Sequence, residues 1–184
     1  MKRMLDIAVS LIGLICLLPL LLLVAVLIKL DSTGPIFFRQ ERIGRGFRPF
    51  QILKFRTMIQ DPFGRRPLIT VGDDPRITRA GRFLRKTKID ELPQLINVLR
   101  GDMCFVGPRP VTPVELMRYG AVRWHYVSVT PGITGLWQVS GRNRTTYDQR
   151  VALDKHYVET RNLWGDVDIL ARPVRVVLTG HGAA

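Results

Sequence analysis

Cysteine, histidine and acidic residues are scarce in this chain of 184 residues. Its two cysteines give neither a disulfide framework nor a metal-ligand spacing, which agrees with a reducing cytoplasm. The three histidines are scattered and indicate neither a zinc site nor a catalytic triad. A Gly-x4-Gly-Lys-Ser/Thr loop and a glycine-rich dinucleotide fingerprint are both missing from the sequence, which argues against a P-loop enzyme and against a dinucleotide-dependent enzyme.

The shortage of acidic residues leaves a strong positive charge. Only 15 aspartates and glutamates oppose 28 basic residues, and 22 of these 28 are arginines. Such a balance suits an anionic partner, namely phospholipid headgroups, nucleotides, phosphorylated substrates or nucleic acid. Arginine also presents a planar fork that binds phosphate with two hydrogen bonds. A solvated positive surface along an anionic leaflet would explain the charge as well, and both explanations can hold together.

One long apolar run, residues 11–28, lies near the N-terminus and has Pro19 near its middle. As a helix of ~1.5 Å per residue, its 18 residues nearly match the ~30 Å of a bilayer core. Lys2 and Arg3 precede the run and a basic stretch follows it, so both flanks favour the cytoplasmic side. A helix that enters, bends at Pro19 and leaves by the same face satisfies both flanks. An ordinary spanning helix is the alternative, because proline is tolerated in membrane helices. With no signal-peptide cleavage site after the run, we expect it to stay attached.

The fold class that we predict is α+β. Residues 1–31 are expected to form an N-terminal membrane helix, either re-entrant or spanning, and residues 32–184 a mainly helical cytosolic domain with a small β-hairpin. Gly44-Arg45-Gly46 is the expected hairpin turn, between strands that begin near Ile36 and end near Arg56. A loop is expected over 61–74. Helices are expected over 75–88, 90–100, 147–161 and 166–178.

Asp90 is the main candidate for a catalytic residue. It is placed to cap the helix over 90–100, and a strongly basic segment comes directly before it. Glu91 adds a second carboxylate, so that the pair could bind Mg²⁺ through hard oxygen ligands. Arg109, held between two prolines, is preorganised to bind phosphate unless it is a simple surface residue. Lys54 and Arg56 share one strand face and are either exposed to solvent or arranged to clamp phosphate.

The order of several motifs resembles the bacterial sugar transferases, the monotopic polyprenol-phosphate phosphoglycosyl transferases of the small, catalytic-core type. The likeness runs through nearly the whole chain. The motifs are Lys2-Arg3 with Asp6, Lys54-Phe55-Arg56-Thr57-Met58, Asp74-Pro75-Arg76-Ile77-Thr78-Arg79, Leu84-Arg85-Lys86-Thr87, Asp90-Glu91-Leu92-Pro93-Gln94-Leu95, Asn97-Val98-Leu99-Arg100-Gly101-Asp102-Met103, Val106-Gly107-Pro108-Arg109-Pro110, Pro131-Gly132-Ile133-Thr134-Gly135 and Gln138-Val139-Ser140-Gly141-Arg142-Asn143. Each motif is weak alone, whereas their order and combination are specific.

The resemblance implies transfer of a sugar 1-phosphate from a UDP-sugar to polyprenyl (undecaprenyl) phosphate, with release of UMP. It implies that Asp90 is the nucleophile, that Glu91 is its dyad partner, and that Mg²⁺, held in part by Asp90, neutralises the diphosphate. Other implied roles are phosphate binding by Arg85 and Arg109, nucleotide contact by Arg142 and Asn143, and membrane association by Lys2, Arg3 and Pro19. The sequence departs from the family pattern at Lys88 and Cys104, where serine is common.

The same resemblance implies that residues 1–31 form a re-entrant membrane helix broken at Pro19, and it places the protein at the bacterial inner membrane as a monotopic enzyme. Its catalytic domain is expected on the cytoplasmic face, serving glycan assembly; nucleic acid is not expected as a partner, and a homodimer is compatible with the sequence. Two alternatives stay open. One is a membrane-anchored basic adaptor that binds anionic lipid or nucleic acid. The other keeps the reaction but lets the lipid phosphate attack directly while Asp90 only holds Mg²⁺.

Overall fold

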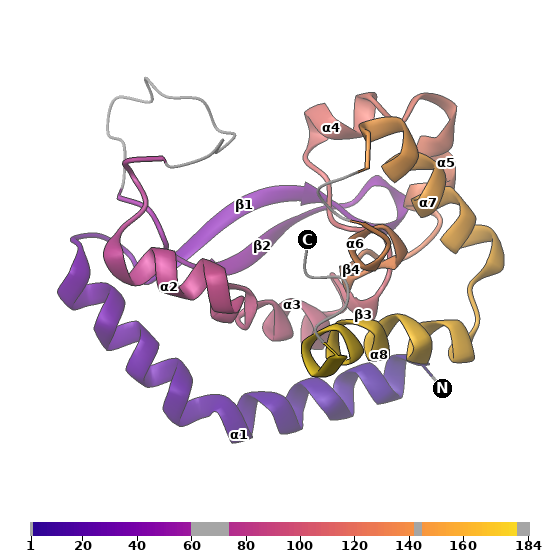
Figure 1. Cartoon of the computed structure of the whole chain (residues 1–184). Coiled ribbons are helices and arrows are strands. Elements are labelled where there is room, and N and C mark those ends of the chain that lie inside the picture. The colour runs from indigo at the N-terminus through magenta and orange to yellow at the C-terminus, as the bar shows by residue number, and fades with distance from the viewer. Residues whose placement is uncertain (1, 60–73, 142–144, 180–184) are drawn as a thin grey trace.

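A mainly helical domain with a small antiparallel hairpin lies against one long N-terminal helix (Figure 1), which confirms the α+β prediction. This computed structural model describes residues 2–59, 74–141 and 145–179. Its elements are α1 (Lys2–Asp31), β1 (Phe37–Ile43), η1 (Arg45–Phe47), β2 (Pro49–Phe55), α2 (Arg79–Thr87), η2 (Ile89–Glu91), α3 (Gln94–Arg100), β3 (Cys104–Val106), α4 (Pro113–Met117), η3 (Gly120–Val122), α5 (Arg123–Val127), β4 (Gly132–Thr134), α6 (Leu136–Val139), α7 (Tyr147–Thr160) and α8 (Leu163–Thr179).

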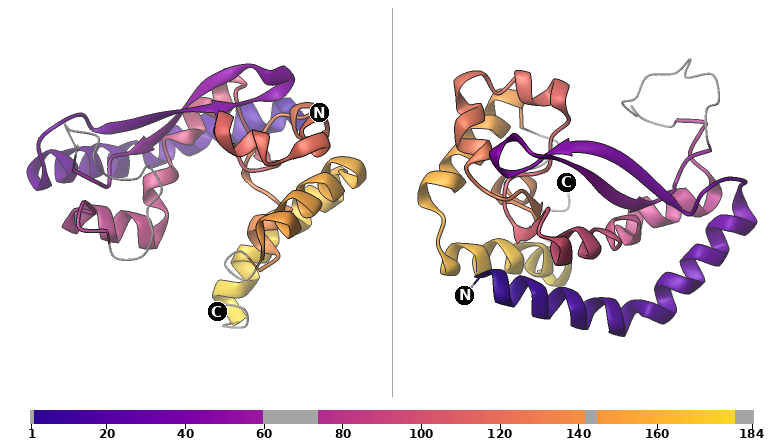
Figure 2. Two further views of the ribbon diagram at one scale, coloured as in Figure 1. Left: turned by 90° about the horizontal axis from the view of Figure 1, so that it is seen from above. Right: turned by 180° about the vertical axis from the view of Figure 1, so that it is seen from behind.

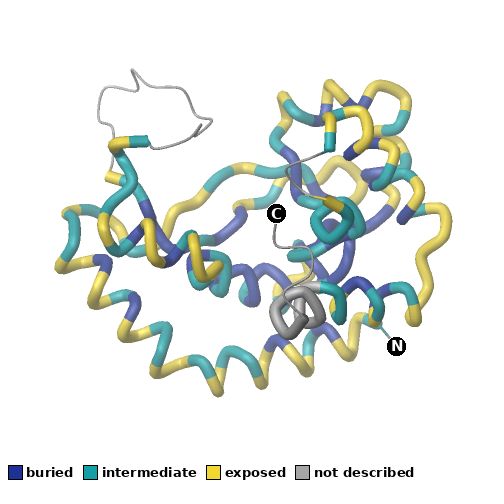
Figure 3. Tube along the Cα trace, in the orientation of Figure 1, coloured by how far each residue is buried: buried dark blue, intermediate teal, exposed yellow. Residues whose placement is uncertain are grey.

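Helix α1 is long and apolar enough to cross a membrane, judged by length and composition. It is bent near its middle in Figure 1, and Pro19 lies inside it. A proline there removes one backbone N–H and clashes with the carbonyl four residues earlier, at Ile15, which bends a helix. Figure 3 shows that much of α1 is exposed, and its large apolar side chains from Met4 to Leu30 account for this. Apolar side chains exposed over such a length indicate a surface that contacts lipid.

Both ends of α1 contact the helical domain (Figures 1 and 2). At the N-terminal end, Lys2 Nζ lies 2.6 Å from an Asp166 carboxylate oxygen, and Arg3 donates to backbone carbonyls at the end of α3. At the other end, Asp31 accepts a hydrogen bond of 3.1 Å from the backbone N–H of Ala80. Ile28 is buried there against Leu84. The two ends of the helix therefore lie on the same side of its bend, facing the domain.

The β1–β2 hairpin links α1 to the rest of the domain. Its register pairs Phe37 with Phe55 and Ile43 with Pro49, which confirms the predicted hairpin and turn. Asn97, fully buried on α3, accepts a hydrogen bond of 2.9 Å from the Leu53 N–H. The same side chain donates to the carbonyl of Gln51 at 2.8 Å. Asn97 therefore fixes α3 against β2.

Other predicted elements differ in their bounds. The helix expected over 75–88 begins only at Arg79, because Thr78 is extended and caps the helix by accepting from the N–H of Gly81. Helices α7 and α8 agree with the predicted pair to within three residues. The short parallel pairing of β3 with β4 was not predicted, since residues 130–134 have the composition of a turn. The loop expected over 61–74 lies outside the described residues except for its last residue.

Candidate active site

The prediction that Asp90 caps a helix is wrong. Lys88 ends α2 in a left-handed conformation with φ 62°, and the chain then makes the 3-10 turn η2, which contains Asp90. Helix α3 starts after Pro93, which lacks a side-chain acceptor, and ends at Gly101 with φ 93°. The helix expected over 90–100 is therefore divided, since Pro93 suits only the first turn of a helix. Asp90 lies in the tight connection between α2 and α3, and its side chain is free of a capping role.

The Asp90 carboxylate is buried without a full set of partners. The residue is 8% exposed, and its Oδ1 atom finds no hydrogen-bond donor among the residues that the structure describes. Burial raises the pKa of Asp90, opposed by the charge of Lys54, while Glu91 raises it further and Lys88 and Arg85 lower it. A buried acceptor without a donor is costly, so natural proteins rarely retain one without a function.

Glu91 is held in its charged form by cations. Lys54 Nζ on β2 lies 2.7 Å from Glu91 Oε1, and Arg109 Nη2 lies 3.8 Å from the same oxygen. Burial alone would raise the pKa of Glu91, but Lys54 and Arg109 together lower it below its usual value. Burial likewise lowers the pKa of Lys54, and Glu91 opposes that change. The predicted pair of carboxylates therefore has unequal members, since Glu91 is paired with two cations through Oε1, whereas Oδ1 of Asp90 has no hydrogen-bond donor among the described residues.

Arg85 is oriented by the end of β2. Its Nε donates to Thr57 Oγ1 at 2.8 Å. Helix α2 can approach so closely because Gly81 has no side chain: a Cβ there would stand 2.1 Å from the Thr57 carbonyl oxygen. Arg85, Lys88, Lys54 and Arg109 thus surround two carboxylates with four cations, an arrangement suited to an added anion such as phosphate.

The remaining predicted residues lie elsewhere. Arg56 does not share the site with Lys54; it is 6% exposed and donates to the carbonyl of Ser32 at 2.6 Å, tying down the end of α1. The interpretation of Arg56 as a solvent-exposed residue is therefore wrong, and its contact with phosphate stays a prediction. Arg142 and Asn143 lie outside the described residues. Lys2 and Arg3 hydrogen-bond to the domain at the far end of α1.

Two residues that position the site were missed from the sequence. Asn97 sets the distance between β2 and α3, and thereby brings Lys54 to Glu91. Thr57 orients Arg85. Both lie in motifs that carry the family resemblance, but nothing in their spacing reveals a contact across 28 residues or more.

The candidate site offers few ligands to a metal ion. The described part of the chain contains no group of three or more histidines, cysteines, aspartates or glutamates suited to a metal. Mg²⁺ needs less, because it commonly binds through one or two carboxylates together with substrate phosphates and water. The Asp90 carboxylate can supply one such ligand, whereas Oε1 of Glu91 is already engaged by Lys54.

Comparison with known proteins gives a family. The model of the family described as bacterial sugar transferase matches residues 1–180. A UDP-galactose-lipid carrier transferase of Erwinia amylovora is 43% identical over 100% of this chain and 41% of its own length. The exopolysaccharide production protein ExoY of Sinorhizobium fredii is 42% identical over 99% of this chain and 87% of its own. The UDP-glucose:undecaprenyl-phosphate glucose-1-phosphate transferase of Caulobacter vibrioides is 45% identical over 99% and 71% respectively.

An exposed apolar helix, long enough by length and composition to cross a membrane, is joined at both ends to a domain in which a pair of carboxylates lies among cations. The chain belongs to the bacterial sugar transferase family. It spans about two fifths of the Erwinia relative, which is therefore a much longer protein, and most of the Sinorhizobium one. The names of the Erwinia and Caulobacter relatives differ in the sugar, galactose in one and glucose in the other.

Proposed function

We propose that the protein transfers a sugar 1-phosphate from a UDP-sugar to polyprenyl phosphate, undecaprenyl phosphate being the expected acceptor, and releases UMP. Membership of the family supports the reaction class, and the names of relatives support the two substrates. One observation of this chain carries the proposal for its site: Oδ1 of Asp90 is buried and unpartnered, although the charges of Lys54, Lys88 and Arg85 act on this carboxylate. A purely structural carboxylate in that place would be expected to have both oxygens paired.

In the first step, Asp90 Oδ1 attacks the phosphorus that carries the sugar. An oxygen–phosphorus bond forms, and the bond from this phosphorus to the bridging oxygen of the diphosphate breaks. The bridging oxygen leaves with the electron pair as part of UMP. Burial assists this step, because a poorly hydrated carboxylate has less solvent to lose before it attacks.

In the second step, an oxygen of the lipid phosphate attacks the same phosphorus. The bond to Asp90 breaks, and its electron pair returns to the carboxylate, so that the enzyme is regenerated and the lipid diphosphate sugar is formed. Arg109 and Arg85 bind the phosphate oxygens, whose negative charge would otherwise repel the incoming lipid phosphate. Lys54 holds Glu91 in place and keeps it ionised beside the nucleophile.

Asp90 would hold Mg²⁺ together with the phosphates of the substrate. When bound, the ion would neutralise the charge of the diphosphate and thereby make UMP a better leaving group. Glu91, whose Oε1 is paired with Lys54, would support this site through its negative charge.

The proposed membrane position is that of a re-entrant helix in the cytoplasmic leaflet of the inner membrane. Both ends of α1 contact the same domain, and its exposed apolar side chains then lie in lipid. In that position the lipid acceptor phosphate and the soluble nucleotide meet at the level of the headgroups, where each Lys or Arg contributes about 1 kcal/mol of attraction to an anionic leaflet.

The decisive experiment uses detergent-purified full-length protein with Mg²⁺, and UDP-glucose or UDP-galactose as donor. Without lipid acceptor, wild type should gain the mass of a phosphosugar in intact-protein mass spectrometry after rapid quenching. With undecaprenyl phosphate, it should release UMP on repeated turnover. Asp90→Asn should do neither while melting at or above the temperature of wild type, since it removes a buried charge. The exposed Asp148→Asn is the matched control and should behave as wild type.

Turnover without any adduct would favour direct attack by the lipid phosphate. Full activity of Asp90→Asn would remove Asp90 from the mechanism. If neither sugar reacts, other UDP-sugars must be tried with the same three proteins, since the sugar is not assigned. If no UDP-sugar gives an adduct or UMP release, the alternative of a membrane-anchored basic adaptor would be favoured.

A further inference from the structure

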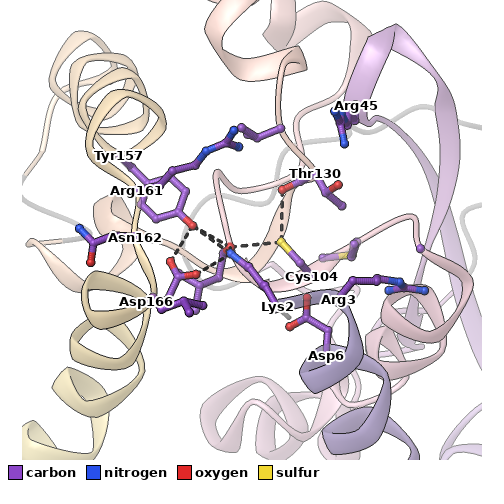
Figure 4. Close-up of a pocket in the computed structure, with 15 residues that line it drawn as sticks. Lys2, Arg3, Asp6, Arg45, Cys104, Thr130, Tyr157, Arg161, Asn162 and Asp166 are labelled. Atoms are coloured by element: carbon purple, nitrogen blue, oxygen red, sulfur yellow. Dashed lines mark hydrogen bonds and ion pairs between the residues drawn. The ribbon is translucent and has the colours of Figure 1, made fainter.

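A second cationic site lies at the N-terminal end of α1. It is a cavity of about 380 Å³ between α1, the turn of the hairpin and the junction of α7 with α8 (Figure 4). We call it the α1 cavity. Gly101, just after α3, lines it, whereas Glu91 precedes α3 at the other end. A helix of seven residues is roughly 10 Å long, so the α1 cavity is separate from the Asp90 site.

Four cations and two carboxylates face the α1 cavity. The cations are Lys2, Arg3, Arg45 and Arg161, and the carboxylates are Asp6 and Asp166.

Only part of the positive charge of the α1 cavity is neutralised. Lys2 pairs with Asp166 at 2.6 Å. Arg3 donates to carbonyl oxygens, which satisfy its N–H groups but not its charge. Arg45 and Arg161 make no ion pair with a carboxylate of the described residues, and Figure 4 shows no contact from either to its neighbours. An open positive charge therefore remains at the rim.

The floor of the α1 cavity is apolar and chemically inert. Met103, Val106 and Val129 are buried there. Cys104 also lines it, but burial raises the pKa of its thiol to about 12, so that the neutral, poorly nucleophilic form prevails near neutral pH. A charged rim over an apolar floor suits a ligand with an anionic group on a less polar body. The volume of the α1 cavity lies within the usual range for small-molecule pockets, about 300–1,000 Å³.

We propose that the α1 cavity binds an anionic phosphate group through Arg45 and Arg161, apart from any phosphate bound beside Asp90. Two guanidinium groups without acidic partners can each donate two parallel hydrogen bonds to phosphate oxygens, and Lys2 and Arg3 add to the positive potential. The phosphate belongs either to the headgroup of an anionic phospholipid or to a soluble compound. The position of the α1 cavity at the end of an apolar, lipid-facing helix makes both accessible.

The test uses the delipidated full-length protein in a nonionic detergent, with Arg109→Ala throughout to weaken phosphate binding beside Asp90. Native mass spectrometry measures binding of short-chain phosphatidylglycerol and phosphatidylcholine, and calorimetry measures binding of inorganic phosphate. Arg45→Ala with Arg161→Ala is compared with Arg48→Ala, an exposed arginine of the same hairpin that does not line the α1 cavity. Melting temperatures without ligand establish that all variants are folded, which the exposure of Arg45 and Arg161 favours.

The double variant should bind phosphatidylglycerol at least tenfold more weakly, because one charge-assisted hydrogen bond already corresponds to about that factor. Arg48→Ala should bind as its parent does. If the double variant loses affinity for phosphatidylglycerol alone, the bound phosphate group is that of a lipid headgroup. If it also loses affinity for inorganic phosphate, the phosphate group is that of a soluble compound. Equal binding by the double variant and its parent, for both anionic ligands, would overturn the proposal.

Discussion

Replacing Lys54 by methionine should destabilise the protein through the carboxylate that it leaves behind. In the native protein Lys54 and Glu91 form a buried ion pair of 2.7 Å, with side chains 18% and 14% exposed. Methionine fills a similar volume but removes the charge, so Glu91 keeps the cost of burial and loses its main partner. Breaking a buried pair from one side typically costs about 3–5 kcal/mol. Arg109 remains 3.8 Å from the same oxygen, which places the expected loss near the lower end, at about 3 kcal/mol.

The assay is thermal unfolding of the detergent-solubilised protein, in which about 3 kcal/mol corresponds to a melting temperature lower by roughly 6–12 °C for a chain of this size. Adding Glu91→Gln to Lys54→Met removes the stranded charge and should recover most of the loss. The effect of pH has a definite sign. In wild type the lowered pKa of Glu91 contributes stability above its usual value of 4.5, and acidification removes it.

In Lys54→Met, by contrast, burial should dominate and raise the pKa of Glu91. Protonation of Glu91 then removes its unpaired buried charge. The difference in melting temperature between the variant and wild type should therefore narrow as the pH falls from 7 towards 5. The reasoning is refuted if Lys54→Met melts with wild type at pH 7. It is equally refuted if the second substitution, Glu91→Gln, recovers nothing, because the loss would then come from packing.

Three further outcomes are expected. Gly81→Ala should cost about 1–3 kcal/mol and lower turnover, measured by thermal melting and UMP release, because its Cβ would meet the carbonyl of Thr57 at 2.1 Å and push α2 away. Burial raises the pKa of Asp154 to about 6, so Asp154→Asn should raise the melting temperature at pH 7.5, and this gain should shrink as wild type becomes protonated between pH 6 and pH 4. A cysteine added ahead of Met1 and a cysteine introduced at the exposed Thr33, which flank α1, should both react with a membrane-impermeant thiol reagent only from the cytoplasmic side.

Each of these outcomes has its own control. Gly165→Ala places a methyl group at ordinary contact distance, 3.5 Å or more, and should leave stability unchanged or slightly higher. A gain for Asp154→Asn that is independent of pH would contradict the assigned pKa. The labelling experiment starts from Cys16→Ser, because Cys16 is exposed on α1. Labelling of the added N-terminal cysteine and of the cysteine at Thr33 from opposite sides would identify a spanning helix.

Much of the fold follows from local patterns in the sequence. The apolar run with its proline, the hairpin around Gly44-Arg45-Gly46, and helices α7 and α8 all have local signals, and the structure has these elements. The β3–β4 pairing depends on the fold instead. Gly107 and Gly132 lie so close that a Cβ on Gly132 would stand 2.2 Å from the backbone nitrogen of Gly107. Two short strands that meet in this way have no periodicity that a sequence could show.

The candidate site was predictable in its members rather than in its geometry. Asp90, Glu91, Arg85 and Arg109 were selected from composition and resemblance, and the structure brings these four together. The capping role given to Asp90 was wrong, because the left-handed Lys88 and the following proline outweigh the capping preference of an aspartate. The pairing of Lys54 with Glu91 joins residues 37 positions apart, and it depends on how Asn97 docks α3 against β2.

The attachment of both ends of α1 to the domain also sets an order of events during synthesis. The N-terminal end of α1 is made first, yet Asp166, the partner of Lys2, follows 164 residues later. At about 5–20 residues per second, a ribosome needs roughly 10–30 s to cover that interval. Throughout this time Lys2 has no Asp166 to pair with, so the N-terminal end of the helix depends on the membrane and on earlier contacts such as those of Arg3 with α3. The contacts between the anchor and the domain are therefore complete only after residue 166 has been made.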